Sequence, residues 1–335
     1  MSLFAALRIS QAFLAVSTVL AGYCLFRFYA YTAGNQRVVP YLLAAGGLLA
    51  VANSAWRALF RAAREPKDLN DVEPRGVSTS TLFLVAAFCT VGGLMCAMTG
   101  GYGSFRSAGV LAIFMLSGTA LFQGVEILSP VLGGLTHGMF FVIGMTAHPA
   151  FDEMLYIQET RLPPVFFAVY MTVTAVLAQV RDSAKPRNTP EGDDLSNETA
   201  SRLLTMRDDV IDGFVVWFGG AALVIVPAAA IWIMPLHWLS IALFLILLVT
   251  VVVKLIPVLV YRTRKDLAAF IESTVRGGCL LNAGVVASLG AYQPREIYDG
   301  LFVSLPSDEE LAAVAVILLL AGPAWLLGRV SEGEA

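Results

Sequence analysis

Apolar residues in this chain of 335 residues gather in long uninterrupted runs. Ten of these runs approach the roughly 20 residues that a helix needs to cross about 30 Å of hydrocarbon. The pattern predicts an all-α polytopic bundle of transmembrane helices. The ten predicted helices cover approximately residues 9–30, 39–62, 80–99, 107–125, 131–148, 163–180, 212–234, 237–258, 268–291 and 310–328.

Three of these runs contain polar residues that interrupt them. Glu126 ends the fourth run, and His137 with several glycines breaks the fifth. Glu272, Arg276 and Asn282 lie within the ninth. Helices of this kind survive in lipid when their polar faces point into the bundle, so the count is ten spans, or nine with one re-entrant segment. The i, i+4 spacing of Glu272 and Arg276 predicts an ion pair that either lines a cavity or ties helices together.

Basic residues are distributed unevenly over the connections between the predicted helices. Short cytoplasmic loops are enriched in Lys and Arg, and an N-terminus in the cytoplasm places most of them on the inner side. The outer side then receives only Arg27, Arg37, Arg106, Arg161 and Arg295. We therefore expect both termini in the cytoplasm, together with two long polar loops at about 63–79 and 181–211. Residues 1–335 are predicted to form a single integral membrane domain.

Composition narrows the function classes. Hydrophobic residues make up 57% of the chain and charged residues 14%, against about 25% charged in a typical soluble domain. Membrane lipid is therefore the expected surrounding of most of the chain. A net charge of -3 without a basic cluster gives no basis for a nucleic-acid partner. The four cysteines and three histidines show no metal-ligand spacing, and no soluble-enzyme nucleotide or hydrolase motif is present.

One polar face stands out at the end of the second predicted helix. Asn53, Arg57 and Arg61 are spaced i, i+4 and i+8, which places them on one side of a helix. Two interpretations apply: the arginines reach the membrane interface and follow the charge rule, or they form an anion site, because guanidinium groups match phosphate geometry.

A second candidate cluster precedes the seventh predicted helix. The segment MRDDVIDGF places Asp208 or Asp209 on the same face as Asp212. These carboxylates are candidates for a metal site. The alternative is that acidic residues at the start of a helix only complement its dipole.

With these residues the chain resembles the UbiA superfamily of intramembrane prenyltransferases, over roughly residues 5–325. That family carries an N-D-x-x-D-x-x-x-D motif at the end of its second helix, and here Asn53 matches the asparagine while Ser54, Arg57 and Arg61 take the places of the aspartates. In the segment VYMTVTAVLAQVRDSAKPRNTP, only Asp182 remains near the second acidic motif. Two further segments, LFQGVEILSPVLGGLTHG and STVRGGCLLNAGVVASLGAY, are similar to the EboC-like subgroup.

The resemblance implies a UbiA-like fold and transfer of a prenyl group from an isoprenoid diphosphate to an acceptor, with Mg²⁺ as cofactor. It implies that the diphosphate lies near Asn53, Arg57, Arg61 and Asp182. The replaced aspartates leave open whether the chain is an enzyme. The alternative is a non-catalytic UbiA-fold membrane protein that binds a lipid or a partner protein, and a transporter is a third hypothesis.

Overall fold

The computed structural model describes residues 9–29, 36–64, 77–122, 128–148, 151, 158–183, 213–233, 238–261, 264–288 and 308–333. Within these ranges the regular structure is entirely helical. It consists of α2 (Ile9–Tyr29), η1 (Gln36–Val38), α3 (Val39–Arg64), α4 (Thr79–Gly100), α5 (Tyr102–Phe122), α6 (Leu128–Met145), α8 (Gln158–Ser183), α10 (Gly213–Ile233), α11 (Trp238–Tyr261), α12 (Arg264–Ser288) and α13 (Asp308–Gly333).

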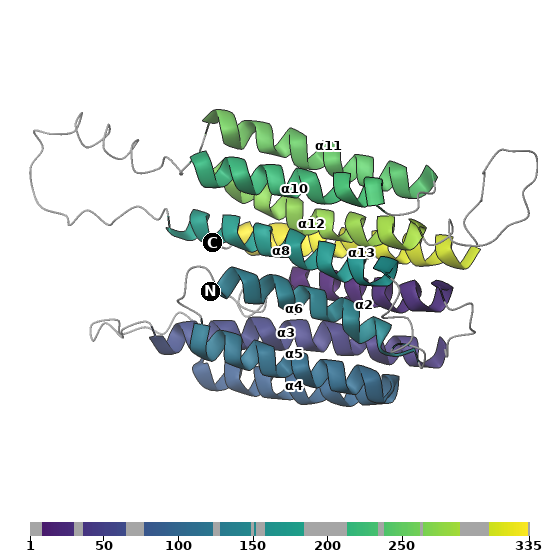
Figure 1. Ribbon diagram of the computed structural model, residues 1–335. Helices are drawn as coiled ribbons and strands as arrows, with labels where there is room; N and C mark the ends of the chain where they lie inside the picture. The colour runs from purple at the N-terminus through teal and green to yellow at the C-terminus, as the bar shows by residue number, and fades with distance from the viewer. Residues whose placement is uncertain are drawn as a thin grey trace, which may run out of the picture.

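Every one of the ten predicted runs is a helix, and this confirms the predicted fold class. Over the described residues, α3, α4, α6, α8, α10 and α11 are long and apolar enough to cross a membrane. The helices lie side by side and alternate in direction (Figure 1), so that α2 begins and α13 ends at the same end of the bundle. The ends of α3, α5 and α8 lie at that end as well.

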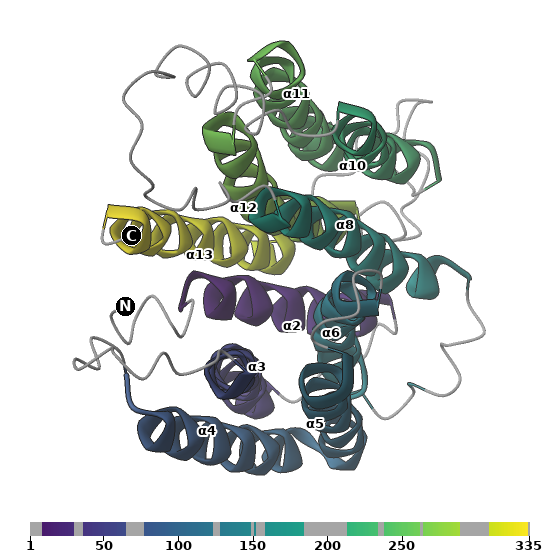
Figure 2. The same ribbon diagram turned by 90° about the vertical axis from the view of Figure 1, so that its left-hand side faces the viewer.

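The bundle has two groups of helices. Contacts join α2, α3, α4, α5 and α6 into one group, and α8, α10, α11, α12 and α13 into the other. The view along the bundle in Figure 2 shows α4 at one edge and α11 at the opposite edge. Helices α2 and α6 connect the groups, because α6 packs on α8 while α2 packs on both α12 and α13.

The outer helices bury one narrow stripe and expose large apolar side chains on the opposite face. In α4 the buried positions recur every three or four residues and are mostly small, namely Leu82, Ala86, Cys89, Gly93, Ala97 and Gly100. On the other side Phe88 is 76% exposed and Leu84 is 65% exposed. A soluble helix would bury this apolar face, whereas lipid solvates it, and the pattern is that of a membrane protein.

Glycines bring α6 into direct contact with two neighbouring backbones. A Cβ atom added to Gly144 would lie 2.1 Å from the carbonyl oxygen of Val19 on α2. On the facing side, a Cβ at Gly22 would lie 2.1 Å from the carbonyl oxygen of Phe141. A Cβ at Gly134 would lie 2.5 Å from the carbonyl oxygen of Ala168 on α8. Small residues at such positions allow close helix packing in lipid, where apolar surface alone gives little driving force.

A buried polar contact joins α2 to α12. The Asn282 amide Nδ2 donates hydrogen bonds to the Ser17 and Thr18 hydroxyls, each at 3.0 Å. Both hydroxyls donate in turn to the Leu14 carbonyl at 2.7 Å. The predicted pair of Glu272 and Arg276 is present in the same helix, with both side chains about three-quarters buried. Polar groups at membrane depth need partners inside the bundle, and these contacts supply part of them; the Asn282 Oδ1 atom has no hydrogen-bond partner among the described residues.

The glycine contacts of α6 lead to a stability prediction. Replacing Gly22 with Ala places a methyl group against the Phe141 backbone, so the helices must separate, and we expect a loss of about 1–3 kcal/mol. A Cβ at Gly109 has nothing within 4 Å, which makes Gly109→Ala the matched control. Thermal unfolding of the detergent-purified variants measures the difference. Equal midpoints for the two variants would contradict the proposed role of Gly22.

Candidate functional site

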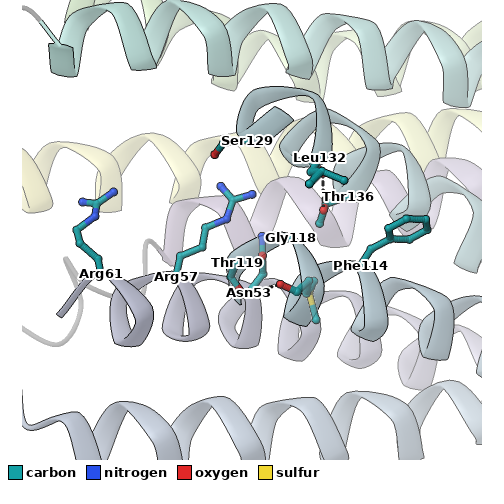
Figure 3. A pocket seen from close by; sticks show the side chains of 10 residues that line it. Asn53, Arg57, Arg61, Phe114, Gly118, Thr119, Ser129, Leu132 and Thr136 are labelled. Atoms are coloured by element: carbon teal, nitrogen blue, oxygen red, sulfur yellow. Dashed lines mark hydrogen bonds between the residues drawn. The ribbon is translucent and has the colours of Figure 1, made fainter. Parts of the chain in front are cut away.

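A pocket of about 90 Å³ lies between α3, α5 and α6, in the half of the bundle where α3 ends (Figure 3). The volume is several times the roughly 10–15 Å³ that a single water requires. Polar and apolar side chains both line it, namely Asn53, Arg57, Arg61, Phe114, Met115, Gly118, Thr119, Ser129, Leu132 and Thr136. The three residues that the sequence placed on one helix face therefore line a single pocket.

Helix α3 is held in one rotational orientation by Trp56. The indole Nε1 donates a hydrogen bond to the Thr90 hydroxyl on α4 at 3.1 Å. The Trp56 ring also packs edge-on against Phe83 of α4, with centroids 5.8 Å apart. Because successive helical residues are about 100° apart, anchoring this face on α4 turns Asn53 and Arg57 toward α5 and α6.

Asn53 is one of the buried polar side chains of the pocket. It is 5% exposed, and its amide oxygen Oδ1 has no hydrogen-bond partner among the described residues. A buried polar atom without a partner costs about 1–3 kcal/mol, and most such groups in native proteins are satisfied. The terminal amide can turn to present either its oxygen or its NH₂ group. Asn53 is therefore poised to bind a polar group that enters the pocket.

Arg57 reaches across the pocket from α3 to α6. A Cβ added to Gly133 would lie 3.4 Å from Nη2 and 4.0 Å from Nη1 of Arg57, so the absence of a side chain at Gly133 leaves room for the guanidinium. Arg57 lies seven residues before the last residue of α3, or about 10 Å from the helix end, and Gly133 lies about 8 Å from the start of α6. The guanidinium thus stays at the depth of its own backbone instead of extending to the interface.

Arg61 lies one turn nearer the end of α3 and is exposed. The three residues therefore form a gradient along one face, from buried Asn53 through half-buried Arg57 to exposed Arg61. The sequence left two interpretations of these arginines, an interfacial position or an anion site. Exposed Arg61 is compatible with both, whereas the half-buried Arg57 fits the anion site better. Figure 3 shows both guanidinium groups extending from α3 toward the side of the pocket formed by α6.

The hydroxyl groups of the pocket were not predicted as site residues. Thr119 donates to the Met115 carbonyl at 2.6 Å, and Thr136 donates to the Leu132 carbonyl at 2.7 Å. Each hydroxyl therefore uses its proton within its own helix and can offer only lone pairs to the pocket. Ser129 and Thr136 are spaced i, i+7, and from this spacing the sequence could have predicted that they lie on one face of their helix.

The pocket lining does not fit the Mg²⁺ ion that the sequence resemblance implies. Magnesium prefers carboxylate oxygens, and the ten lining residues include none. Over the described residues no group of three His, Cys, Asp or Glu side chains is placed to hold a metal. Asp182 belongs to the last turn of α8, but its side chain, like all of Asp208, Asp209 and Asp212, lies outside what the structure describes. The carboxylate candidates stay predictions.

The fold and the pocket together define a class: a polytopic helical membrane protein with a cationic cavity inside the bundle. No protein-family model and no curated protein matches the chain. Among solved structures it is similar to a UbiA homolog from Aeropyrum pernix K1, at 13% identity and a TM-score of 0.57, covering 84% of this chain and 98% of that one. A digeranylgeranylglyceryl phosphate synthase in membranes matches at 10% identity and a TM-score of 0.49, covering 85% and 98%.

The likeness to the Aeropyrum pernix structure shows that this chain has a UbiA-like fold. The shared part is nearly the whole of that chain, so the arrangement of the helices and not one local motif carries the similarity. At this level of identity, the likeness concerns the fold alone. What the pocket binds has to be argued from its own residues.

The environment of Asn53 predicts opposite effects for two asparagine substitutions. Asn53→Leu removes an amide whose oxygen is unsatisfied, and we expect it to raise the stability of the ligand-free protein by about 1 kcal/mol. Asn282→Leu also removes an unsatisfied amide oxygen, but it breaks two hydrogen bonds between α2 and α12, and we expect these to dominate and stability to fall by a similar amount. Thermal midpoints in detergent test both substitutions. A loss of stability in Asn53→Leu as large as that in Asn282→Leu would show that Asn53 is a structural residue.

Proposed function

We propose that this chain binds an isoprenoid diphosphate inside the membrane and transfers its prenyl group to an acceptor, as a UbiA-like prenyltransferase. The observation that carries the proposal is the cationic pocket. It combines two guanidinium groups with a buried amide, in the half of the bundle where α3 ends. An arginine within a transmembrane helix is costly, about 2.5–3.5 kcal/mol at the helix centre and less toward the ends, and such residues generally serve a function.

The shape and charge of the pocket suit the head of such a ligand better than its chain. Guanidinium forks bind phosphate oxygens through paired charge-assisted hydrogen bonds. A volume of about 90 Å³ accepts a phosphate-sized head, so a prenyl chain would extend beyond the pocket past the apolar side chains of Phe114, Met115 and Leu132. A ligand with an anionic head and a long apolar tail matches both features and is soluble in the membrane.

Prenyl transfer from this position follows from the charges of the pocket. The bond between the allylic carbon and the diphosphate oxygen breaks, and its electron pair leaves with the diphosphate. Arg57 and Arg61 stabilise that developing charge, and the low dielectric of the bundle strengthens their effect. The acceptor nucleophile then bonds to the allylic carbon and loses a proton, which the departing diphosphate accepts.

A second function, binding without catalysis, is supported by the lack of carboxylates in the pocket lining. In that case the chain holds an anionic isoprenoid or another lipid and releases it unchanged. Release of inorganic diphosphate separates the two proposals, because only transfer cleaves the ligand. A transporter would move the ligand across sealed vesicles, and the pocket gives that hypothesis no particular support.

The binding prediction concerns the two arginines of the pocket. Arg57→Gln/Arg61→Gln keeps most of the side-chain volume but removes both charges, and we expect it to weaken geranylgeranyl diphosphate binding by about tenfold or more. Arg106→Gln is the matched control. Arg106 is exposed near the start of α5, whereas the α5 residues that line the pocket lie toward the end of this helix. Titration of the labelled ligand into detergent-purified protein measures both variants.

Two results would count against the proposal. If the double variant binds as well as the wild type, the arginines do not hold the diphosphate head. If Arg106→Gln weakens binding equally, the effect reflects overall charge and not the pocket. Diphosphate release from the bound ligand, measured in the same preparations with membrane extract as the source of acceptor, decides between transfer and binding alone.

A further inference from the structure

Among the described residues, the pocket lining includes cationic groups that bind a diphosphate and no carboxylate that would bind a metal. Its charged lining residues are Arg57 and Arg61, and its remaining polar atoms belong to the neutral side chains of Asn53, Thr119, Ser129 and Thr136. A divalent cation would lose most of its hydration here and gain no carboxylate in exchange. It would also lie beside two positive charges, which repel it strongly in a medium of low dielectric constant.

Arg57 is positioned to act as a fixed cation. Its guanidinium lies against Gly133, on the side of the pocket that α6 forms. Arg57 lies one helical turn nearer the end of α3 than Asn53, and its guanidinium stays beside the α6 backbone at Gly133. A planar guanidinium held in this way presents several N–H donors in fixed directions, as a coordinated metal would present its open coordination sites.

Asn53 completes the arrangement from the inner end of the pocket. Its amide is one helical turn from Arg57 on the same face, and its oxygen has no partner among the described residues. The amide can donate to a phosphate oxygen or accept from a protonated one. Arg61 lies at the opposite, exposed end, where it can meet the outer phosphate.

We propose that the diphosphate head is bound here without a divalent cation, with Arg57 and Arg61 supplying the positive charge that Mg²⁺ would otherwise supply. The proposal rests on the proposed function, since it concerns how the same pocket holds its ligand. Binding without a divalent cation is the opposite of the Mg²⁺ dependence that the sequence resemblance implies. In chemical terms, the recognised group is an anionic phosphate ester. The affinity of the pocket for this group should fall when salt is added and stay unchanged when a chelator removes divalent cations.

The decisive experiment measures geranylgeranyl diphosphate binding to the full-length, detergent-purified protein in EDTA and in excess Mg²⁺. We expect dissociation constants that agree within about twofold. Binding that occurs only with Mg²⁺ overturns this inference and leaves the proposed function in place. No binding in either medium overturns the proposed function itself, and this inference with it.

Variants locate the charge that replaces the metal. In EDTA, Arg57→Gln should weaken binding by about tenfold, whereas Arg57→Lys should weaken it less, because it keeps the charge and loses the fork. Asp208→Asn/Asp209→Asn should bind as the wild type does in both media. A loss of binding in that pair, with Arg57→Gln unaffected, assigns recognition to a carboxylate and metal site and overturns the inference.

Competition separates a prenyl diphosphate from other phosphate-bearing lipids. Inorganic diphosphate should displace the labelled ligand in EDTA, and geranylgeraniol, which lacks the anionic head, should not. Displacement by phosphatidic acid at equal concentration would show that the site recognises a lipid phosphate in general and would overturn the assignment to a diphosphate. Unchanged thermal midpoints in the Arg57 variants confirm that any loss of binding is not a loss of folding.

Discussion

The close approach of α6 to its neighbours is the constraint on which the rest of the structure depends. In lipid, apolar surface gives little reason for helices to associate, so packing depends on backbones that can touch. Gly144 and Gly22 allow this between α6 and α2, and Gly134 allows it between α6 and α8. Because α2 and α8 belong to different helix groups, these contacts join the two parts of the bundle.

The same glycine-rich segment shapes the pocket. The contacts of Gly134 and Gly144 with α8 and α2 fix the position of α6, and this also fixes where Gly133 lies. The Arg57 guanidinium occupies the space next to Gly133. A side chain larger than a methyl group there would push the charge outward, toward the membrane surface. Packing and electrostatics are therefore coupled in α6, since its glycines fix the helix position and also leave the space in which a cation sits at membrane depth.

Two kinds of polar group occur inside the bundle. Asn282 donates hydrogen bonds to Ser17 and Thr18 of a neighbouring helix, and Glu272 with Arg276 forms an ion pair within one helix. Such groups stabilise one arrangement of helices. Asn53 differs in position, because it lines a pocket together with two arginines of the same helix face. An amide oxygen without a hydrogen-bond partner among the described residues is common to Asn53 and Asn282. Its position in a pocket with two arginines, and not the unsatisfied oxygen alone, therefore separates Asn53 from the polar contacts that join helices.

The sequence by itself determined the helices and the face on which Asn53, Arg57 and Arg61 lie, because both follow from local rules: the length of apolar runs and the 3.6-residue period. It also predicted the pairing of Glu272 with Arg276, which is local in the chain. Only the tertiary structure decided that Arg57 crosses to Gly133, that Thr119 and Thr136 line the same pocket, and that the oxygen of Asn53 has no partner while Asn282 binds Ser17. Those facts depend on which helices meet and at what rotation, and contacts between residues far apart in the chain leave no periodic signal in it.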